Sequence, residues 1–248
     1  MTLRRFNNYD LEGMPAVLAW NPIAMRCDRV DEGCRNCWHL RMCDRLANNH
    51  SMRVNSFVYK KDGVGIDLPI SIIDTELPRK PRIIAVQFMG DLWHTKVPDG
   101  FRNTVLHICR RTSQHTYLFL TKRPECVTED IPANCWLGAS VHDQASAEKR
   151  IPVLAMSTAA NIWVSAEPLL GKIDFNLVGG FDRVRWVACG GETGLGARPF
   201  DGAWINEIAR VCERTNKRFY DKRALSTDGF TRREYPREWK TDQGNQKT

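Results

Sequence analysis

The chain has 248 residues, enough to bury a full hydrophobic core as one large α/β domain. Its formal net charge of +7 and pI near 9.0 favour an anionic partner such as nucleic acid, although scattered basic residues are equally typical of a solvated surface. No stretch reaches membrane-spanning length and the N-terminus lacks the apolar core of a signal peptide, so we expect a cytoplasmic protein without a membrane partner and with reduced cysteines.

The first 80 residues contain one expected strand, at 17–20, followed by a cysteine-rich loop and by an insertion at 48–80. Beyond residue 80, short β-branched runs alternate with amphipathic segments, which predicts strand–helix units and a parallel sheet. The strands are expected at 82–88, 115–120, 135–139, 161–165, 184–189 and 218–220, and the helices at 100–111, 146–156 and 202–215.

This order of elements predicts an α/β fold, a partial (β/α) barrel of about six parallel strands that is TIM-barrel-like and carries an N-terminal cysteine loop. We expect one domain over residues 1–223, with the insertion at 48–80 inside it. Residues 224–248 are polar and are expected to form a C-terminal tail.

Three cysteines, Cys27, Cys34 and Cys37, lie within eleven residues. Thiolates are soft ligands for zinc and for iron–sulfur clusters, and the close pair Cys34 and Cys37 can present two sulfurs to one metal site. Three ligands are an odd count, because a structural zinc and a fully ligated four-iron cluster both take four. The loop therefore either has a fourth ligand elsewhere or leaves one metal position open.

The zinc interpretation needs a further donor close by. The neighbouring candidates are His39, Cys43 and His50. Zinc ribbons usually have two separated cysteine pairs rather than one pair and a single residue, but the spacing leaves both interpretations open.

Most of the expected strands end in a polar or glycine motif. The carboxyl ends of parallel strands meet at one edge of the sheet, which we call the mouth, so these motifs and the cysteine loop should lie together. Gly90 with Asp91, and the pair Gly190 and Gly191 with Glu192, combine a carboxylate with backbone that a ligand can approach closely. The alternatives are a helix-capping aspartate and a tight turn with a solvated glutamate.

Charged residues follow several of the same strands. Lys122 and Arg123 come after a strongly apolar strand, where they form either a surface pair or a contact with a carboxylate or phosphate. Glu167 either lines the site or caps a loop. Arg198 has the same two interpretations as Glu167, and Lys222 either contacts a substrate or is exposed, which is the commoner outcome for a lysine.

Tryptophans mark the expected core. Five lie in or beside predicted strands, and most of them should be buried: Trp20, Trp93, Trp136, Trp163 and Trp186. Trp38 and Trp93 are expected near the mouth because they flank the cysteine loop and the first strand-end motif.

Taken together, these motifs resemble a phage and prophage protein family of largely unassigned function with a three-cysteine loop near its N-terminus. The resemblance runs through Trp20-Asn21-Pro22, Gly33 to Cys37, Met89 to His94, Leu120 to Glu125, Trp136-Leu137-Gly138, Glu167 to Gly171, Gly190 to Gly194 and Ala197-Arg198-Pro199. That family in turn resembles radical S-adenosylmethionine (radical SAM) enzymes, which have a partial barrel with a three-cysteine loop after the first strand. Here six residues separate Cys27 from Cys34, where radical SAM enzymes usually have three.

The resemblance implies a [4Fe-4S] cluster on Cys27, Cys34 and Cys37, with S-adenosylmethionine on the open iron and an external electron donor. By position, Asp91 beside Gly90 would receive the cofactor ammonium. Further residues would line the ribose and adenine: Ser140, Glu167, Gly190, Gly191 and Glu192. Substrate contacts are expected from Trp93, Lys122, Arg123, Arg198 and Lys222, and no catalytic residue is assigned.

The resulting hypothesis is a phage-encoded radical SAM enzyme in the host cytoplasm, of isomerase or transferase type. Its expected substrate is a nucleobase in phage DNA, for instance a hypermodified pyrimidine that is modified or rearranged. Two alternatives stay open: a zinc-stabilised nucleic-acid-binding protein without catalysis, and a radical SAM enzyme that acts on a small metabolite.

Overall fold

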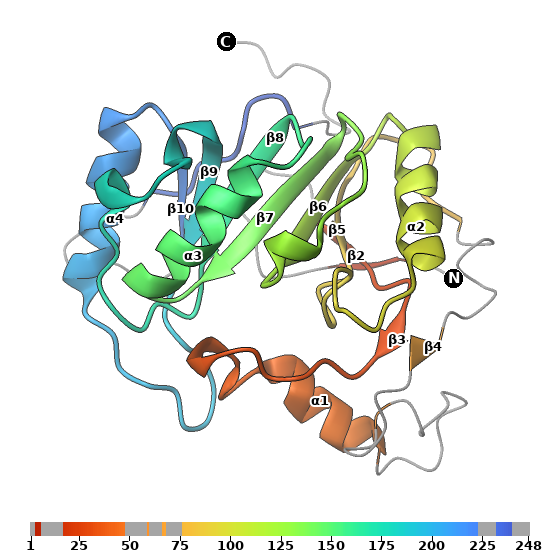
Figure 1. Ribbon diagram of the computed structural model, residues 1–248, viewed down its shortest axis with the longest axis horizontal. Helices are drawn as coiled ribbons and strands as arrows, with labels where there is room; N and C mark the ends of the chain where they lie inside the picture. The colour runs from red at the N-terminus through yellow and green to blue at the C-terminus, as the bar shows by residue number, and fades with distance from the viewer. Residues whose placement is uncertain are drawn as a thin grey trace.

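A computed structural model gives the fold of the chain (Figure 1). It describes residues 3–5, 17–47, 59, 66–67, 76–222 and 232–239. Most of the expected insertion at 48–80 and the position of His50 lie outside these ranges. Among the helices within them, none has the length and hydropathy required to cross a membrane.

The described chain forms one curled sheet in the order β1-β2-β5-β6-β7-β8-β9-β10, in which β1 is antiparallel to β2 and the other neighbours are parallel. The strands are β1 (Arg4–Arg5), β2 (Leu18–Trp20), β5 (Ile83–Val86), β6 (Thr116–Thr121), β7 (Cys135–Val141), β8 (Asn161–Ala166), β9 (Val184–Cys189) and β10 (Arg218–Asp221). A separate antiparallel pair consists of β3 (Ala24–Met25) and β4 (Ile66–Asp67). The predicted partial barrel is confirmed, with every expected strand overlapping an observed one.

The parallel strands form where the sequence has continuous apolar runs, because both faces of the sheet are covered. All seven residues of β7 and all four of β5 are buried. Side chains alternate between the faces: Ile84 and Val86 belong to the core on one side of the sheet, and Ile83 and Ala85 to a second cluster on the other.

Four α-helices accompany the sheet in the described ranges: α1 (Trp38–Ala47), α2 (Asp99–Arg111), α3 (Gln144–Ala155) and α4 (Gly202–Arg214). The last three match the expected helices and lie along the outside of the sheet (Figure 1). Asp143 begins α3 with a capping box, in which its carboxylate accepts from Ser146 N and the Ser146 hydroxyl accepts from Asp143 N. α1 was not predicted, and it lies across the mouth next to the cysteine loop (Figure 1).

The second core cluster contains an aromatic plug, formed by Trp163, Trp186, Tyr235 and Trp239. The ring centroids of Trp163 and Trp186 are 4.9 Å apart, as are those of Trp186 and Trp239. Tyr235 and Trp239 come from the segment that was expected to be a polar tail. Residues 232–239 of that segment are held against the sheet, since two of their aromatic rings are buried and Trp186 Nε1 donates to Glu234 O at 2.9 Å.

Gly138 makes this packing possible on β7. A Cβ at this position would collide with the indole ring of Trp163, which lies directly over the strand. Trp163 is fully buried, and its Nε1 donates to Phe119 O at 3.0 Å. Glycine is therefore required here by the close approach of a core side chain rather than by a turn.

Candidate metal and cofactor site

The cysteine loop, residues 27–37, crosses the mouth between β3 and α1. A single 3-10 turn, Glu32–Cys34, shapes its second half, with Cys34 N donating to Asp31 O at 2.9 Å and Cys37 N to Cys34 O at 3.3 Å. Cys34 is buried, while Cys27 and Cys37 are partly exposed. All three are free thiols on one short loop at the carboxyl ends of the strands, as expected.

Asp31 anchors the middle of the loop to the sheet. Lys122 Nζ donates to its carboxylate at 2.9 Å, the Arg150 guanidinium forms a second ion pair, and His142 Nδ1 lies 3.7 Å away. Burial acts to raise the pKa of Asp31, but Lys122 and Arg150 outweigh it and hold the pKa well below its usual range. Charge pairing therefore fixes the loop between Cys27 and Cys34.

A second anchor connects the start of the loop to β5 and β6. Arg123 forms ion pairs with both Asp28 and Asp91, at 3.2 Å in the case of Asp91. Asp91 also accepts from Thr121 Oγ1 at 2.8 Å, from Trp93 N at 3.0 Å and from the backbone N of Lys122. With every side of its carboxylate engaged and only 4% of the residue exposed, Asp91 has no oxygen left for a cofactor ammonium. Asp91 instead positions Arg123.

The far end of the loop is held by Glu192, after β9. Its carboxylate accepts from Asn36 Nδ2 at 2.8 Å, from Arg198 N at 2.9 Å and from two nitrogens of the Arg198 guanidinium, at 2.9 and 2.6 Å. Arg198 also donates to Glu32 O at 2.9 Å. The hydrogen bonds from Arg198 lower the pKa of Glu192 to about 2. Glu192 and Arg198 clamp the loop and are not free for a ligand.

Glu167, at the end of β8, differs from these saturated acids. Its Oε2 accepts from Lys222 Nζ at 2.5 Å, while its Oε1 is buried without a hydrogen-bond partner. Ser140 Oγ donates to the backbone O of Glu167 at 3.1 Å, and a Cβ on Gly190 would lie 3.1 Å from the Lys222 Cβ. Glu167 is therefore a partly buried acid at the mouth with one oxygen that has no hydrogen-bond partner.

Two of the strand-end glycines have a packing explanation. Gly90 has φ +126°, and a Cβ there would lie 2.5 Å from Met25 Sδ. A Cβ on Gly191 would overlap the ring of Phe200. Both positions need glycine because another part of the chain lies against them.

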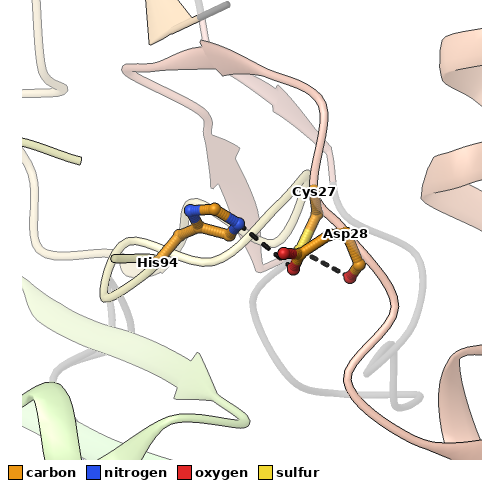
Figure 2. Close-up of side chains that lie close together, drawn as sticks. All are labelled: Cys27, Asp28 and His94. Carbon is orange, nitrogen blue, oxygen red and sulfur yellow. Dashed lines mark hydrogen bonds and ion pairs between the residues drawn. The ribbon is translucent and has the colours of Figure 1, made fainter. Parts of the chain in front are cut away.

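The sequence did not reveal one further group, shown in Figure 2. Cys27, Asp28 and His94 place a sulfur, an oxygen and a nitrogen within 4.8 Å of one another. His94 is fully buried, and its Nε2 lies 3.1 Å from Asp28 Oδ1 without the geometry of a formed hydrogen bond. His94 Nδ1 accepts from Lys96 N at 3.1 Å, so the neutral ring carries its hydrogen on Nε2, pointing toward the loop. His94 ends a motif that was recognised, but its distance of 66 residues from Asp28 hid the contact.

The environment of Cys27 keeps its thiol protonated. Burial, followed by the charge of Asp91, raises the pKa of Cys27 to about 12, although Arg123 acts in the opposite direction. A thiol of this kind is a poor nucleophile at neutral pH. It becomes a ligand only when a metal displaces its proton, as is usual for cysteine sites.

Cys43 does not complete a site with the loop cysteines. It is fully buried on α1, with its Sγ 3.5 Å from His39 Nε2 and 3.9 Å from Met25 O. Over the described ranges, Cys27, Asp28 and His94 are the one group of three such donors within 4.8 Å. The zinc interpretation with Cys43 or His39 as fourth ligand to the loop is therefore not supported by this arrangement.

The residues expected to contact substrate have other partners. Trp93 is fully buried, its Nε1 donating to Glu129 Oε2 at 2.9 Å, so neither ring face is open to a base. The four cations, Lys122, Arg123, Arg198 and Lys222, pair with Asp31, with Asp28 and Asp91, with Glu192, and with Glu167, respectively. They contact carboxylates, one of the two alternatives that the sequence left open for Lys122 and Arg123, but these carboxylates belong to the chain itself.

Comparison with known proteins gives a family but no activity. Residues 16–246 match a family model described as "Protein of unknown function (DUF5131)". The match spans the cysteine loop, every parallel strand and the described C-terminal segment 232–239. No curated protein and no solved structure matches the chain.

Proposed function

The chain belongs to the DUF5131 family, and we propose that it is a radical SAM enzyme that modifies or rearranges a nucleobase in phage DNA. One observation carries the proposal: a loop with three thiols is fastened by ion pairs across the carboxyl end of a half-barrel. In parallel α/β folds this end holds the ligand site. The cluster ligands would be Cys27, Cys34 and Cys37.

The donor set fits a four-iron cluster with one open iron. The loop supplies the three thiolates that such a cluster takes, although in the described ranges their sulfurs do not form a group within 4.8 Å of one another, and Cys27 instead groups with Asp28 and His94. When bound, such a cluster receives an electron from an external donor and supports cleavage of S-adenosylmethionine to a 5′-deoxyadenosyl radical that abstracts hydrogen. Arg123, held by Asp91 beside Cys27, would offset the negative charge of the thiolate.

Among the described strand-end acids, Glu167 is the best-supported cofactor contact. Its unpaired Oε1 at the end of β8 can accept a hydrogen bond from an ammonium group or from a ribose hydroxyl. Asp91 is not proposed for this role because its carboxylate already accepts from four donors of the chain itself. Ser140 supports Glu167 through its backbone oxygen and is assigned to positioning.

A single-ion site is the second candidate, because Cys27, Asp28 and His94 gather three donor types (Figure 2). Such a site would suit a zinc-stabilised nucleic-acid-binding protein. The hydrogen bond from Lys96 N to His94 Nδ1 weighs against it. A metal on Nε2 requires the hydrogen on Nδ1, where it would face the Lys96 N–H group.

Anaerobic reconstitution with iron and sulfide tests the proposal. We expect visible iron–sulfur absorbance that is lost in C27S, C34S and C37S but retained in C126S, a partly buried cysteine outside the loop. After reduction with S-adenosylmethionine, the wild type should release 5′-deoxyadenosine. Stoichiometric zinc with no iron–sulfur absorbance would overturn the proposal in favour of the second candidate.

The substrate class is tested with the reconstituted enzyme. Formation of 5′-deoxyadenosine that depends on DNA and falls as salt rises supports a nucleobase in DNA, because phosphate contacts weaken with salt. Turnover of a free nucleoside that does not depend on salt would instead identify a small metabolite as the substrate.

A further inference from the structure

α1 presents a solvent face that combines an aromatic ring with positive charge. Trp38, Arg41, Met42 and Arg45 recur at the spacing of one helix face and line a shallow pocket of ≈ 390 Å³. The opposite face is buried through His39, Leu40 and Cys43. The exposed face is therefore not needed to attach the helix to the rest of the fold.

Trp38 is the unusual member of this face. It is 47% exposed, whereas Trp20, Trp93, Trp163 and Trp186 are all buried to within 2%. A tryptophan with an open ring is uncommon on a surface that serves only for solubility. It directly follows Cys37, the last residue of the cysteine loop.

The two arginines of the face have no carboxylate partner among the described residues. Asp44 is the acidic residue of α1, and it pairs with Arg26 at 2.9 Å. Within the described ranges, the contact of Arg45 is with the sulfur of Met42, to which it donates at 3.0 Å. The charge of Arg41 and Arg45 is therefore not neutralised by the described part of the chain.

The turn at residues 194–196 extends this surface toward the mouth. A Cβ on Gly194 would lie 3.3 Å from an Arg41 guanidinium nitrogen, and Gly196 O accepts from Asn36 Nδ2 at 2.9 Å. Leu195 between them is 93% exposed. The basic face of α1 and the cysteine loop are therefore continuous through one turn.

We propose that this face binds single-stranded nucleic acid, with a base stacked on Trp38 and phosphates on Arg41 and Arg45. Every base has a π-face that can stack on an aromatic ring, and nearby cations can contact the phosphates of a single nucleic-acid strand. A duplex keeps its bases paired and stacked, so it cannot offer a base to the indole without unstacking. The inference rests on the proposed function in one respect. Only if the cysteine loop is the active site is the bound single-stranded nucleic acid also the substrate.

The test is fluorescence anisotropy of the full chain with a labelled single-stranded oligodeoxynucleotide and with its duplex. We expect the single strand to bind more tightly. W38A should weaken binding about tenfold or more, which is the effect of removing one stacked base. The double variant R41Q/R45Q should weaken binding and lower the dependence on salt, by about 0.7 in the logarithmic slope for each phosphate that the variant no longer binds.

Matched controls are available elsewhere on the surface. M156A removes an exposed apolar side chain, 85% exposed, and R210Q removes an exposed arginine of α4. Both should bind like the wild type. Unchanged affinity in folded W38A and R41Q/R45Q, or tighter binding of the duplex, would overturn the inference.

Binding is measured with and without the cluster, so the two proposals fail separately. Wild-type affinity in C34S would support the docking surface whatever metal the loop holds. A reconstituted enzyme that forms 5′-deoxyadenosine but binds no oligonucleotide would overturn the docking surface and leave the proposed enzyme class intact.

Discussion

The arginines of the mouth and those of α1 differ in one respect, their partners. Arg123, Arg150 and Arg198 each form an ion pair with a carboxylate of the cysteine loop, whereas Arg41 and Arg45 have none among the described residues. The paired guanidinium groups fix the position of the cysteine loop, and the unpaired groups on α1 keep their charge available to a ligand. The same residue type therefore serves structure in one region and recognition in the other.

Burial explains why the two regions differ. The side chain of Arg150 is 4% exposed, and a buried guanidinium without a counterion is costly. The loop supplies its own counterions, Asp28, Asp31 and Glu32, between its cysteines. Arg41 and Arg45 lie in solvent, where a charge needs no partner.

Removing a buried arginine should have the largest effect. Arg150 pairs with Asp31 and also donates to Ser140 O at 2.9 Å and to Lys122 O at 3.1 Å. R150M leaves these acceptors without their donor, and we expect the free energy of unfolding to fall by about 3 kcal/mol. Urea denaturation measures this loss. R210M, on the exposed side of α4, should change stability by less than about 0.5 kcal/mol.

If R150M were as stable as R210M, the mouth arginines would be no more structural than surface ones. The proposed difference between the ion-paired arginines of the mouth and the unpaired arginines of α1 would then be wrong for the mouth. If R150M lost both stability and iron loading, Arg150 would also be needed to position the proposed ligands, because its partner Asp31 lies between Cys27 and Cys34.

The Glu192 clamp should produce a smaller effect that depends on pH. The pKa of Glu192 is lowered from 4.5 to about 2, so its contribution to stability is complete above pH 4.5 and disappears as the pH falls toward 2. We expect E192Q to cost about 1 kcal/mol at pH 7, allowing for solvent screening. This difference from the wild type should shrink between pH 5 and pH 2, as measured by urea denaturation at each pH.

The control for this prediction is E207Q, which removes the carboxylate of an exposed ion pair with Lys172. Its stability difference from the wild type should be small at every pH. A difference for E192Q that stays constant down to pH 2 would show that the clamp acts through packing rather than charge.

The sheet was predictable because its signal is local. A buried parallel strand is a continuous apolar run, and 184–189 was predicted to the residue as β9 (Val184–Cys189). α1 was missed because its apolar positions are few, with histidine and cysteine filling part of its buried face. The aromatic plug was not predicted because Tyr235 and Trp239 lie in a polar stretch, and their packing against Trp163 and Trp186 is visible only in the folded chain.

The sequence was sufficient to predict which cysteines belong to the candidate site, but not which carboxylates are free to contact a ligand. Three cysteines in one loop can be recognised from spacing alone. Whether a carboxylate is free depends on distant donors: Asp91 is saturated by side chains and backbone around β6, while Glu167 keeps one oxygen unpaired. No local pattern distinguishes these two acids, since each simply follows a strand.

The smallest expected effect lies on α1 and tests the other side of the comparison. R41Q/R45Q should change the free energy of unfolding by less than about 0.5 kcal/mol, because no described carboxylate loses a partner. R26Q is the matched variant, since Arg26 pairs with Asp44 of the same helix and donates to Tyr59 O at 2.9 Å. It should cost about 1 kcal/mol or more. If R41Q/R45Q were instead as destabilising as R26Q in urea denaturation, these arginines would be structural and their charge would not be available to a nucleic-acid strand.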